Sequence, residues 1–224
     1  MKTILGARRL GILALMCGLS ACGGGGSSAS TDTGYPLDSA MSAFFQAQHS
    51  YSLTASTGSD HYILLRRWQP GGMQTFQGVS AFSTVQIADF SDNGSSVSGD
   101  IQTKFFLTGP YKLLGSIDTD GRVFVSTKQT ALPDLASPGD SGKFFTSKRY
   151  TDASLTTVEL TDVMTWDLTA VTADTAMLCF EDASTATGSS FTSTSSLCYI
   201  MDQRGNITAI QNTVTLGGVQ LTFK

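Results

Sequence analysis

The sequence predicts a mainly β protein, an antiparallel sandwich or barrel with one short N-terminal helix. Short apolar runs alternate with polar residues, most visibly across residues 219–223, as expected for half-buried strands. Turn-forming Asn-Gly and Asp-Gly pairs at 93–94 and 120–121 separate such runs. Among the 18 acidic residues only Glu159 and Glu181 are glutamates, and aspartate favours turns whereas glutamate favours helices.

One helix is predicted from Pro36 to about His49. Proline suits the first turn of a helix, where its missing N–H group is not needed. Apolar residues then recur at i, i+4, i+7 and i+8, at Leu37, Met41, Phe44 and Phe45. Everything after this segment is predicted to form strands.

The strands are expected to be short and separated by turns rich in Gly, Asn, Asp and Pro. In chain order they are predicted at 50–55, 60–68, 73–79, 82–90, 101–107, 111–118, 121–128, 143–151, 155–160, 162–171, 175–182, 194–201, 206–212 and 218–223. Residues 134–142, flanked by Pro133 and containing Pro138, resemble a linker near the middle.

That break divides two stretches of similar sequence. The turn at 118–123 matches 202–207, and Arg66-Arg67-Trp68 matches 148–150 at nearly the same offset. We therefore predict a β-rich domain over 35–224 and leave open an internal duplication. The two repeats would cover about 50–132 and 140–224, with one Trp, 68 or 166, in the core of each.

Residues 1–21 indicate a secretory leader. Lys2, Arg8 and Arg9 precede an apolar run at 10–19, which is shorter than the about 20 residues that a membrane-spanning helix needs. Small residues follow the run and lead to Cys22.

The four residues Leu19-Ser20-Ala21-Cys22 resemble the lipobox of bacterial lipoproteins. The resemblance implies cleavage before Cys22 and a diacylglyceryl group on its sulfur, so that the protein is anchored to a membrane by lipid. Gly23 stands where Asp would favour the inner membrane, so the resemblance implies the outer membrane, on its periplasmic or surface face.

Residues 22–34 are rich in Gly and Ser and predict a flexible tether between this anchor and the domain. The chain carries 14 Lys and Arg against 18 Asp and Glu, and three of the basic residues lie in the leader. This acidic balance argues against a nucleic-acid partner. Nothing in the sequence identifies a protein or small-molecule partner.

The four cysteines predict one disulfide. Cys17 belongs to the leader and Cys22 is the predicted lipidation site, which leaves Cys179 and Cys198 as a pair. If their strands are antiparallel neighbours with the cysteines opposed, Met177 faces Ile200 and Glu181 faces Ser196. No Cys-x-x-Cys pair or histidine cluster is present, so no metal and no cofactor are expected.

One segment, Gly139-Asp140-Ser141-Gly142, resembles the nucleophile region of chymotrypsin-like serine proteases. The resemblance implies Ser141 as nucleophile, a base at His61 or His49, and Asp89 or Asp118 to orient that base. However, Lys143 follows where the family has Gly, and neither histidine lies in the family's sequence context. A turn is the favoured interpretation, and no catalytic residue is predicted.

Two further motifs have a structural interpretation beside a functional one. Asp118-x-Asp120-Gly121 resembles part of a calcium loop but lacks the later Glu, so a hairpin turn is favoured. Arg66-Arg67-Trp68 suits a cation–π or anion-binding face. The favoured alternative is a strand with Trp68 inward and one Arg outward.

These observations predict a lipid-anchored cell-envelope protein with a non-enzymatic structural or binding role. The alternatives are a serine-type hydrolase through Ser141 and a carrier of apolar ligands. An apolar inner face around an unfilled cavity would favour the carrier. A histidine within hydrogen-bond reach of Ser141 would favour the hydrolase, and a filled core with neither would favour a structural role.

Overall fold

The computed structural model describes residues 34–224 except 97–100, 110, 190–191 and 217–218. These residues belong to one compact unit. The described residues form one helix, α1 (Leu37–Phe45), and thirteen strands. The strands are β1 (His49–Thr57), β2 (Asp60–Phe76), β3 (Val79–Asp92), β4 (Ser95–Ser96), β5 (Ile101–Thr108), β6 (Lys112–Asp118), β7 (Val123–Gln129), β8 (Ser141–Tyr150), β9 (Val158–Ala170), β10 (Thr175–Ala186), β11 (Thr192–Asp202), β12 (Ile207–Leu216) and β13 (Val219–Phe223).

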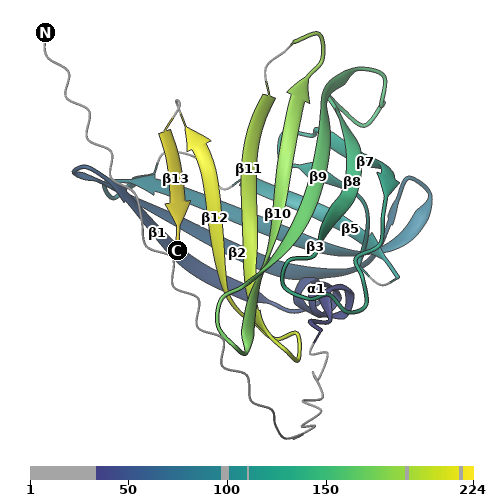
Figure 1. The fold of residues 1–224 in the computed structure, drawn as a ribbon. Coiled ribbons are helices and arrows are strands. Elements are labelled where there is room, and N and C mark those ends of the chain that lie inside the picture. The colour runs from purple at the N-terminus through teal and green to yellow at the C-terminus, as the bar shows by residue number, and fades with distance from the viewer. Residues whose placement is uncertain (1–33, 97–100, 110, 190–191, 217–218) are drawn as a thin grey trace, which may run out of the picture. The chain divides into compact units, whose positions relative to one another are not determined.

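The strands form one antiparallel meander that curls into a nearly closed barrel (Figure 1). Twelve of them are neighbours in chain order, and the short β4 pairs with β3 beside this path. The barrel closes between β1 and the end of β13. There the backbone N–H of Thr54 donates to Lys224 at 2.9 Å, and the N–H of Lys224 donates back at 3.1 Å. The predicted choice between sandwich and barrel is thus resolved as a barrel.

Side chains alternate between the inside and the outside of the barrel wall. On β2, Leu64 and Trp68 are buried in the main core, and Arg66 lies between them on the same face. Arg67 faces outward and pairs with Asp89 at 2.6 Å. The strand with Trp68 inward and one Arg outward is confirmed, and the other arginine lies inside the barrel.

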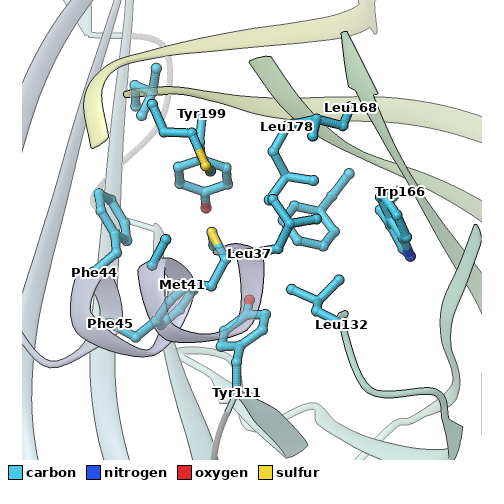
Figure 2. Packing of buried hydrophobic residues seen from close by; sticks show 14 of the residues in the cluster. Leu37, Met41, Phe44, Phe45, Tyr111, Leu132, Trp166, Leu168, Leu178 and Tyr199 are labelled. Carbon is cyan, nitrogen blue, oxygen red and sulfur yellow. The ribbon is translucent and has the colours of Figure 1, made fainter. Parts of the chain in front are cut away.

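Helix α1 fills one end of the barrel (Figures 1 and 2). Its Phe44 ring lies 5.1 Å from the rings of both Trp68 and Tyr199, which come from β2 and β11. Its Phe45 ring lies 5.1 Å from that of Tyr111. We call this the helix end, which includes the turns at 77–78, 171–174 and 203–206. The turns at 58–59, 119–122 and 151–157 lie at the opposite far end, because successive antiparallel strands alternate in direction.

The helix is shorter than predicted and stops at Phe45 instead of continuing to His49. Its last carbonyl groups are taken by partners outside the helix. Thr84 Oγ1 donates to the Phe45 oxygen at 2.5 Å, and His49 Nε2 donates to the Phe44 oxygen at 3.1 Å. His49 is instead the first residue of β1, opposite Trp68.

Two predicted strand breaks are wrong. Residues 60–68 and 73–79 were expected as separate strands, but β2 continues to Phe76 across a bulge between Pro70 and Gly72. The turn comes later, at Gln77 and Gly78, whose φ angles are 49° and 78°. Likewise, 155–160 and 162–171 are not separate, since β9 is one strand from Val158.

The proline-flanked stretch at 134–142 is not a linker between domains. Strands β7 and β8 on either side of it pair directly, so the sheet continues. Leu132 and Ala136 are buried in the main core, and Ala136 exchanges backbone hydrogen bonds of 2.8 and 3.0 Å with Tyr35. Trp68 and Trp166 belong to this same core rather than to two.

The two turns behind the predicted duplication have the same backbone geometry. Gly121 and Gly205 have φ angles of 83° and 84°. The N–H groups of Asp118 and Asp202 donate to Arg122 and Asn206 at 3.0 and 3.1 Å, respectively. Yet they lie at opposite ends of the barrel, because an odd number of strands separates them. Their placement gives the duplication no support beyond the shared turn geometry, and the duplication stays a prediction.

Candidate functional site

The predicted disulfide is present on the outer face of the barrel. Cys179 and Cys198 are bonded, with their Cα atoms 3.9 Å apart, and they lie opposite each other on β10 and β11. Met177 pairs with Ile200 and Glu181 with Ser196, so the predicted register is confirmed. The predicted lipidation site Cys22, its leader and nearly all of the tether lie outside the described residues.

The residues of the hydrolase alternative are not brought together. Ser141 is the first residue of β8 and pairs with Asp167. His61 lies in the far-end hairpin with Nδ1 3.0 Å from Ser56 Oγ, and the ring of His49 stacks on Phe44 at 4.1 Å. The contacts of the His61 and His49 rings are thus with Ser56 and Phe44 and not with Ser141. Asp89 is paired with Arg67.

The calcium-like turn is a hairpin. Asp118 Oδ1 accepts a hydrogen bond from Thr103 Oγ1 at 2.8 Å, and Asp120 forms an ion pair with Arg122 at 3.1 Å. Both carboxylates thus have side-chain partners within the fold. Across the described residues, no group of three or more His, Cys, Asp or Glu side chains is arranged to hold a metal ion.

The inside of the barrel beyond α1 is hollow. One chamber of about 220 Å³ lies next to the helix and includes Phe45, Arg66 and Tyr199 in its wall. A second chamber of about 370 Å³ lies toward the far end and includes Asp118 and Asp162. The two chambers share wall residues, among them Gln86, Phe105, Leu113, Phe145, Met164 and Asp182, so we describe them as one barrel cavity.

Apolar side chains form much of the cavity wall and come from α1 and from strands β5 to β12. The aromatic rings of Phe105 and Phe145 stand on β5 and β8, and Leu113 and Met164 stand on β6 and β9. A pocket with apolar walls and a few polar groups is the usual form of a small-molecule site. Ligand-sized space inside the barrel is therefore the candidate functional site.

Arg66 is the basic residue in this wall. Its Nε atom is buried without a hydrogen-bond partner, and the guanidinium forms no ion pair with any described residue. Burial lowers the pKa of Arg66 to about 10, so the side chain remains charged at neutral pH. Burial also raises the pKa of the neighbouring Tyr199 hydroxyl, which therefore stays protonated and able to donate.

Three carboxyl groups face the chamber nearer the far end. Asp162 is only 2% exposed, and its two oxygens lie 3.0 Å from Ser147 Oγ and 2.6 Å from Ser184 Oγ. Asp182 shares Ser184, at 3.2 Å, while its other oxygen is buried without a partner. Burial, reinforced by the Asp162 carboxylate, raises the pKa of Asp182 to about 6. Burial also raises the pKa of Asp118.

From the sequence, Arg66 is given an anion-binding face only as the disfavoured alternative, and Asp118 is given only the roles of a calcium ligand or a base-orienting group. No role is assigned to Asp162 or Asp182. The spacing of two between Arg66 and Trp68 nevertheless places both on one face of a strand. Asp162 and Asp182 carry a similar signal, because each lies two residues from an apolar inward position, Met164 or Phe180. An ionisable residue in phase with a buried apolar row is the pattern that marks the cavity wall.

Comparison with known proteins does not add a family to this description: no family model, curated protein or solved structure matches the chain. Among the described residues, no helix is both long and apolar enough to cross a membrane.

Proposed function

We propose that this protein is a lipid-anchored protein of the bacterial cell envelope that binds a small, largely apolar molecule inside its barrel, without catalysis. The observation that carries the binding role is the cavity. Aromatic and aliphatic side chains from several strands face a space that the helix does not fill. This is the arrangement that favours a carrier of apolar ligands over a purely structural protein.

The envelope location rests on the sequence. A charged and then apolar leader ends in Leu19-Ser20-Ala21-Cys22, and the Gly- and Ser-rich segment that follows suits a tether. The disulfide between Cys179 and Cys198 fits an oxidising compartment outside the cytoplasm. A location at the outer membrane follows from the lipoprotein resemblance through Gly23.

The anchor can be tested in cells fed labelled palmitate. Cys22→Ser should abolish label uptake and leave a precursor that still carries its leader. Cys17→Ser, which changes the other N-terminal cysteine, is the matched control and should be labelled like the wild type. Full labelling of the Cys22→Ser protein would refute the anchor.

The binding role can be tested by filling the cavity. Met164 faces the cavity, whereas its neighbour Val163 lies on the outer face of β9. The uncharged probe N-phenyl-1-naphthylamine, which fluoresces in apolar surroundings, should bind the purified chain saturably. Met164→Trp should raise its Kd at least about tenfold, the equivalent of 1.4 kcal/mol. Val163→Trp should leave the Kd unchanged, and equal binding by all three proteins would place the probe outside the cavity.

A further inference from the structure

The charges that face the cavity are not equally satisfied. Hydroxyl groups donate hydrogen bonds to the carboxylates: Ser147 and Ser184 donate to Asp162, and Thr103 donates to Asp118. Asp182 has the nearby Ser184 and can also take up a proton, which removes its charge. Carboxylates in this cavity therefore have partners or an alternative state within the protein.

Arg66 has neither. An arginine does not lose its proton at neutral pH, and no described carboxylate forms an ion pair with this one. The adjacent Arg67 shows the difference, because it faces outward and meets Asp89 at 2.6 Å. A charge in the protein interior is costly unless it is paired, and none of the ion pairs of the described residues involves the half-buried Arg66, so this part of the cavity wall favours an anionic group.

Other polar groups surround the same point. Tyr199 and Gln86 line the chamber with Arg66 and offer a hydroxyl and an amide that can donate. Asn212, only 2% exposed, also lines it, with its Oδ1 buried and unpaired while Nδ2 donates to the Ser196 oxygen at 3.0 Å. Donors around a guanidinium suit an oxyanion, and Asn212 Oδ1 suits a ligand hydroxyl or N–H.

Apolar side chains enclose this polar point. Phe45, Phe105 and Leu197 line the same chamber as Arg66, and the wall continues through Phe145 toward the far end. A ligand that places a charged group at Arg66 must therefore have an apolar body. Asp182 lines both chambers, and with a pKa of about 6 it is mostly ionised at neutral pH, so it would repel a second anionic group.

We infer that the cavity binds an amphipathic organic monoanion, with a carboxylate paired to Arg66 and an apolar body along the aromatic wall. This inference rests on the proposed function, because it assigns the chemistry of the ligand in the same cavity. Arg66 is the selecting residue, and Tyr199 and Gln86 are the additional donors to the bound oxygens.

The test compares head groups on one chain length. The Kd values of decanoate, decan-1-ol and decylammonium are measured on the purified wild-type chain by calorimetry below their micelle concentrations. Decanoate should bind about 10- to 100-fold more tightly than decan-1-ol, the range expected for hydrogen bonds to a charged group. Decylammonium should bind most weakly. Tighter binding of decylammonium than of decanoate would overturn the inference and make the carboxylates the selecting groups.

Variants then assign the preference to one side chain. Arg66→Gln should remove the advantage of decanoate over decan-1-ol, and Arg66→Lys, which keeps the charge but loses the planar fork, should retain part of it. Arg67→Gln is the matched control and should retain all of it. Circular dichroism confirms that each variant is folded.

The two proposals fail differently. If decanoate and decan-1-ol bind equally and compete with the naphthylamine probe, the anion preference is wrong but the binding role stands. If none of the ligands binds, and Met164→Trp behaves like the wild type, the binding role is wrong and the anion site falls with it. A decanoate preference that survives Arg66→Gln would overturn the role of Arg66.

Discussion

The two halves of the barrel are built from the same strands but are filled in opposite ways. Around α1, the inward positions of β2, β10 and β11 hold Trp68, Leu178 and Tyr199, which form one core with the helix. Figure 2 shows Leu178 and Tyr199 in this core together with Leu37 and Met41 of the helix. Beyond α1, the inward positions of β9 and β10 hold Asp162 and Asp182. One strand thus contributes to a filled apolar core at one end and to a cavity at the other.

This difference teaches that the closely packed core and the cavity are separated along the barrel axis. At the helix end, large side chains meet in close contact, and removing atoms leaves a gap that the structure cannot easily close. In the other half, the cavity and the charged groups in its wall reduce what that half contributes to the free energy of unfolding. The cavity, in turn, leaves space of ligand size inside the barrel. The predictions that follow test this separation, from the largest expected effect to the smallest.

The strongest test is one substitution made in both halves. Phe44→Ala removes a buried ring that contacts Trp68 and Tyr199, so it should lower the free energy of unfolding by about 3–5 kcal/mol. Phe124→Ala removes a ring that faces the cavity and should cost about half as much or less. Urea unfolding measures both. Ser39→Ala, on the exposed face of α1, is the control, and equal losses at Phe44 and Phe124 would contradict the comparison.

The disulfide should come next in size. It closes a loop between residues 19 apart in sequence, which corresponds to about 3 kcal/mol of stabilisation. Replacing both Cys179 and Cys198 by Ser should lower the unfolding free energy by that amount. Alkylation and intact-mass measurement, with and without reductant, establish that the wild type carries the bond. Two free thiols in the unreduced protein would exclude it.

The two equivalent turns provide a matched pair of glycines. Gly121 and Gly205 share a positive φ, so Ala is strained at both positions. An added Cβ has open space at Gly121 but meets Pro36 Cγ at 3.0 Å and Ala40 Cβ at 3.1 Å at Gly205. Gly121→Ala should cost about 1 kcal/mol and Gly205→Ala about 2 kcal/mol or more. Equal losses in the free energy of unfolding would show that the contact of the added Cβ with Pro36 and Ala40 has no effect on stability.

The smallest effect depends on pH. Asp182 keeps its proton up to about pH 6 in the folded protein, against a reference value of 3.8. Its favourable contribution is therefore present at low pH and is lost as the pH rises from about 4 to 6. Asp182→Asn should stabilise the protein at pH 8 by about 1 kcal/mol after solvent screening, and this gain should vanish below pH 4.

Asp202 gives the opposite sign at the helix end. Hydrogen bonds from Asn206 and Arg204 lower the pKa of its carboxyl, so its contribution is present at neutral pH and is lost on acidification. Asp202→Asn should therefore destabilise the protein at pH 8. Thermal unfolding across pH 3–8 compares the two variants. If both substitutions changed the stability at pH 8 in the same direction, the raised pKa of Asp182 would be contradicted.

The sequence was sufficient for features that depend on local pattern. Alternation and turn residues predicted most strands, and the opposed cysteines predicted the register of β10 against β11, because cross-strand pairing follows once one pair is fixed. Helix α1 was predicted from its apolar spacing. Its early end was not, since that depends on Thr84, which is distant in sequence and meets the Phe45 carbonyl only in the folded barrel.

The cavity could not be predicted in the same way. Alternation shows that Arg66 shares a face with Trp68, but it does not show whether another element covers that face. The filled end and the hollow end differ because the nine-residue α1 covers only part of the inner surface. The length and position of the helix thus decide which inward residues become core and which line the cavity.

The closure between β1 and β13 has a consequence for how the barrel assembles and opens. Other neighbouring strands on the path are joined by short stretches of chain, so they can pair in sequence as successive hairpins. Closing the ring joins the first strand to the last, which carries the greatest loop-closure cost of any pairing. We expect this junction to form last in folding. The amides of Thr54 and Lys224 should then exchange with solvent hydrogen sooner than those of the β10–β11 pair.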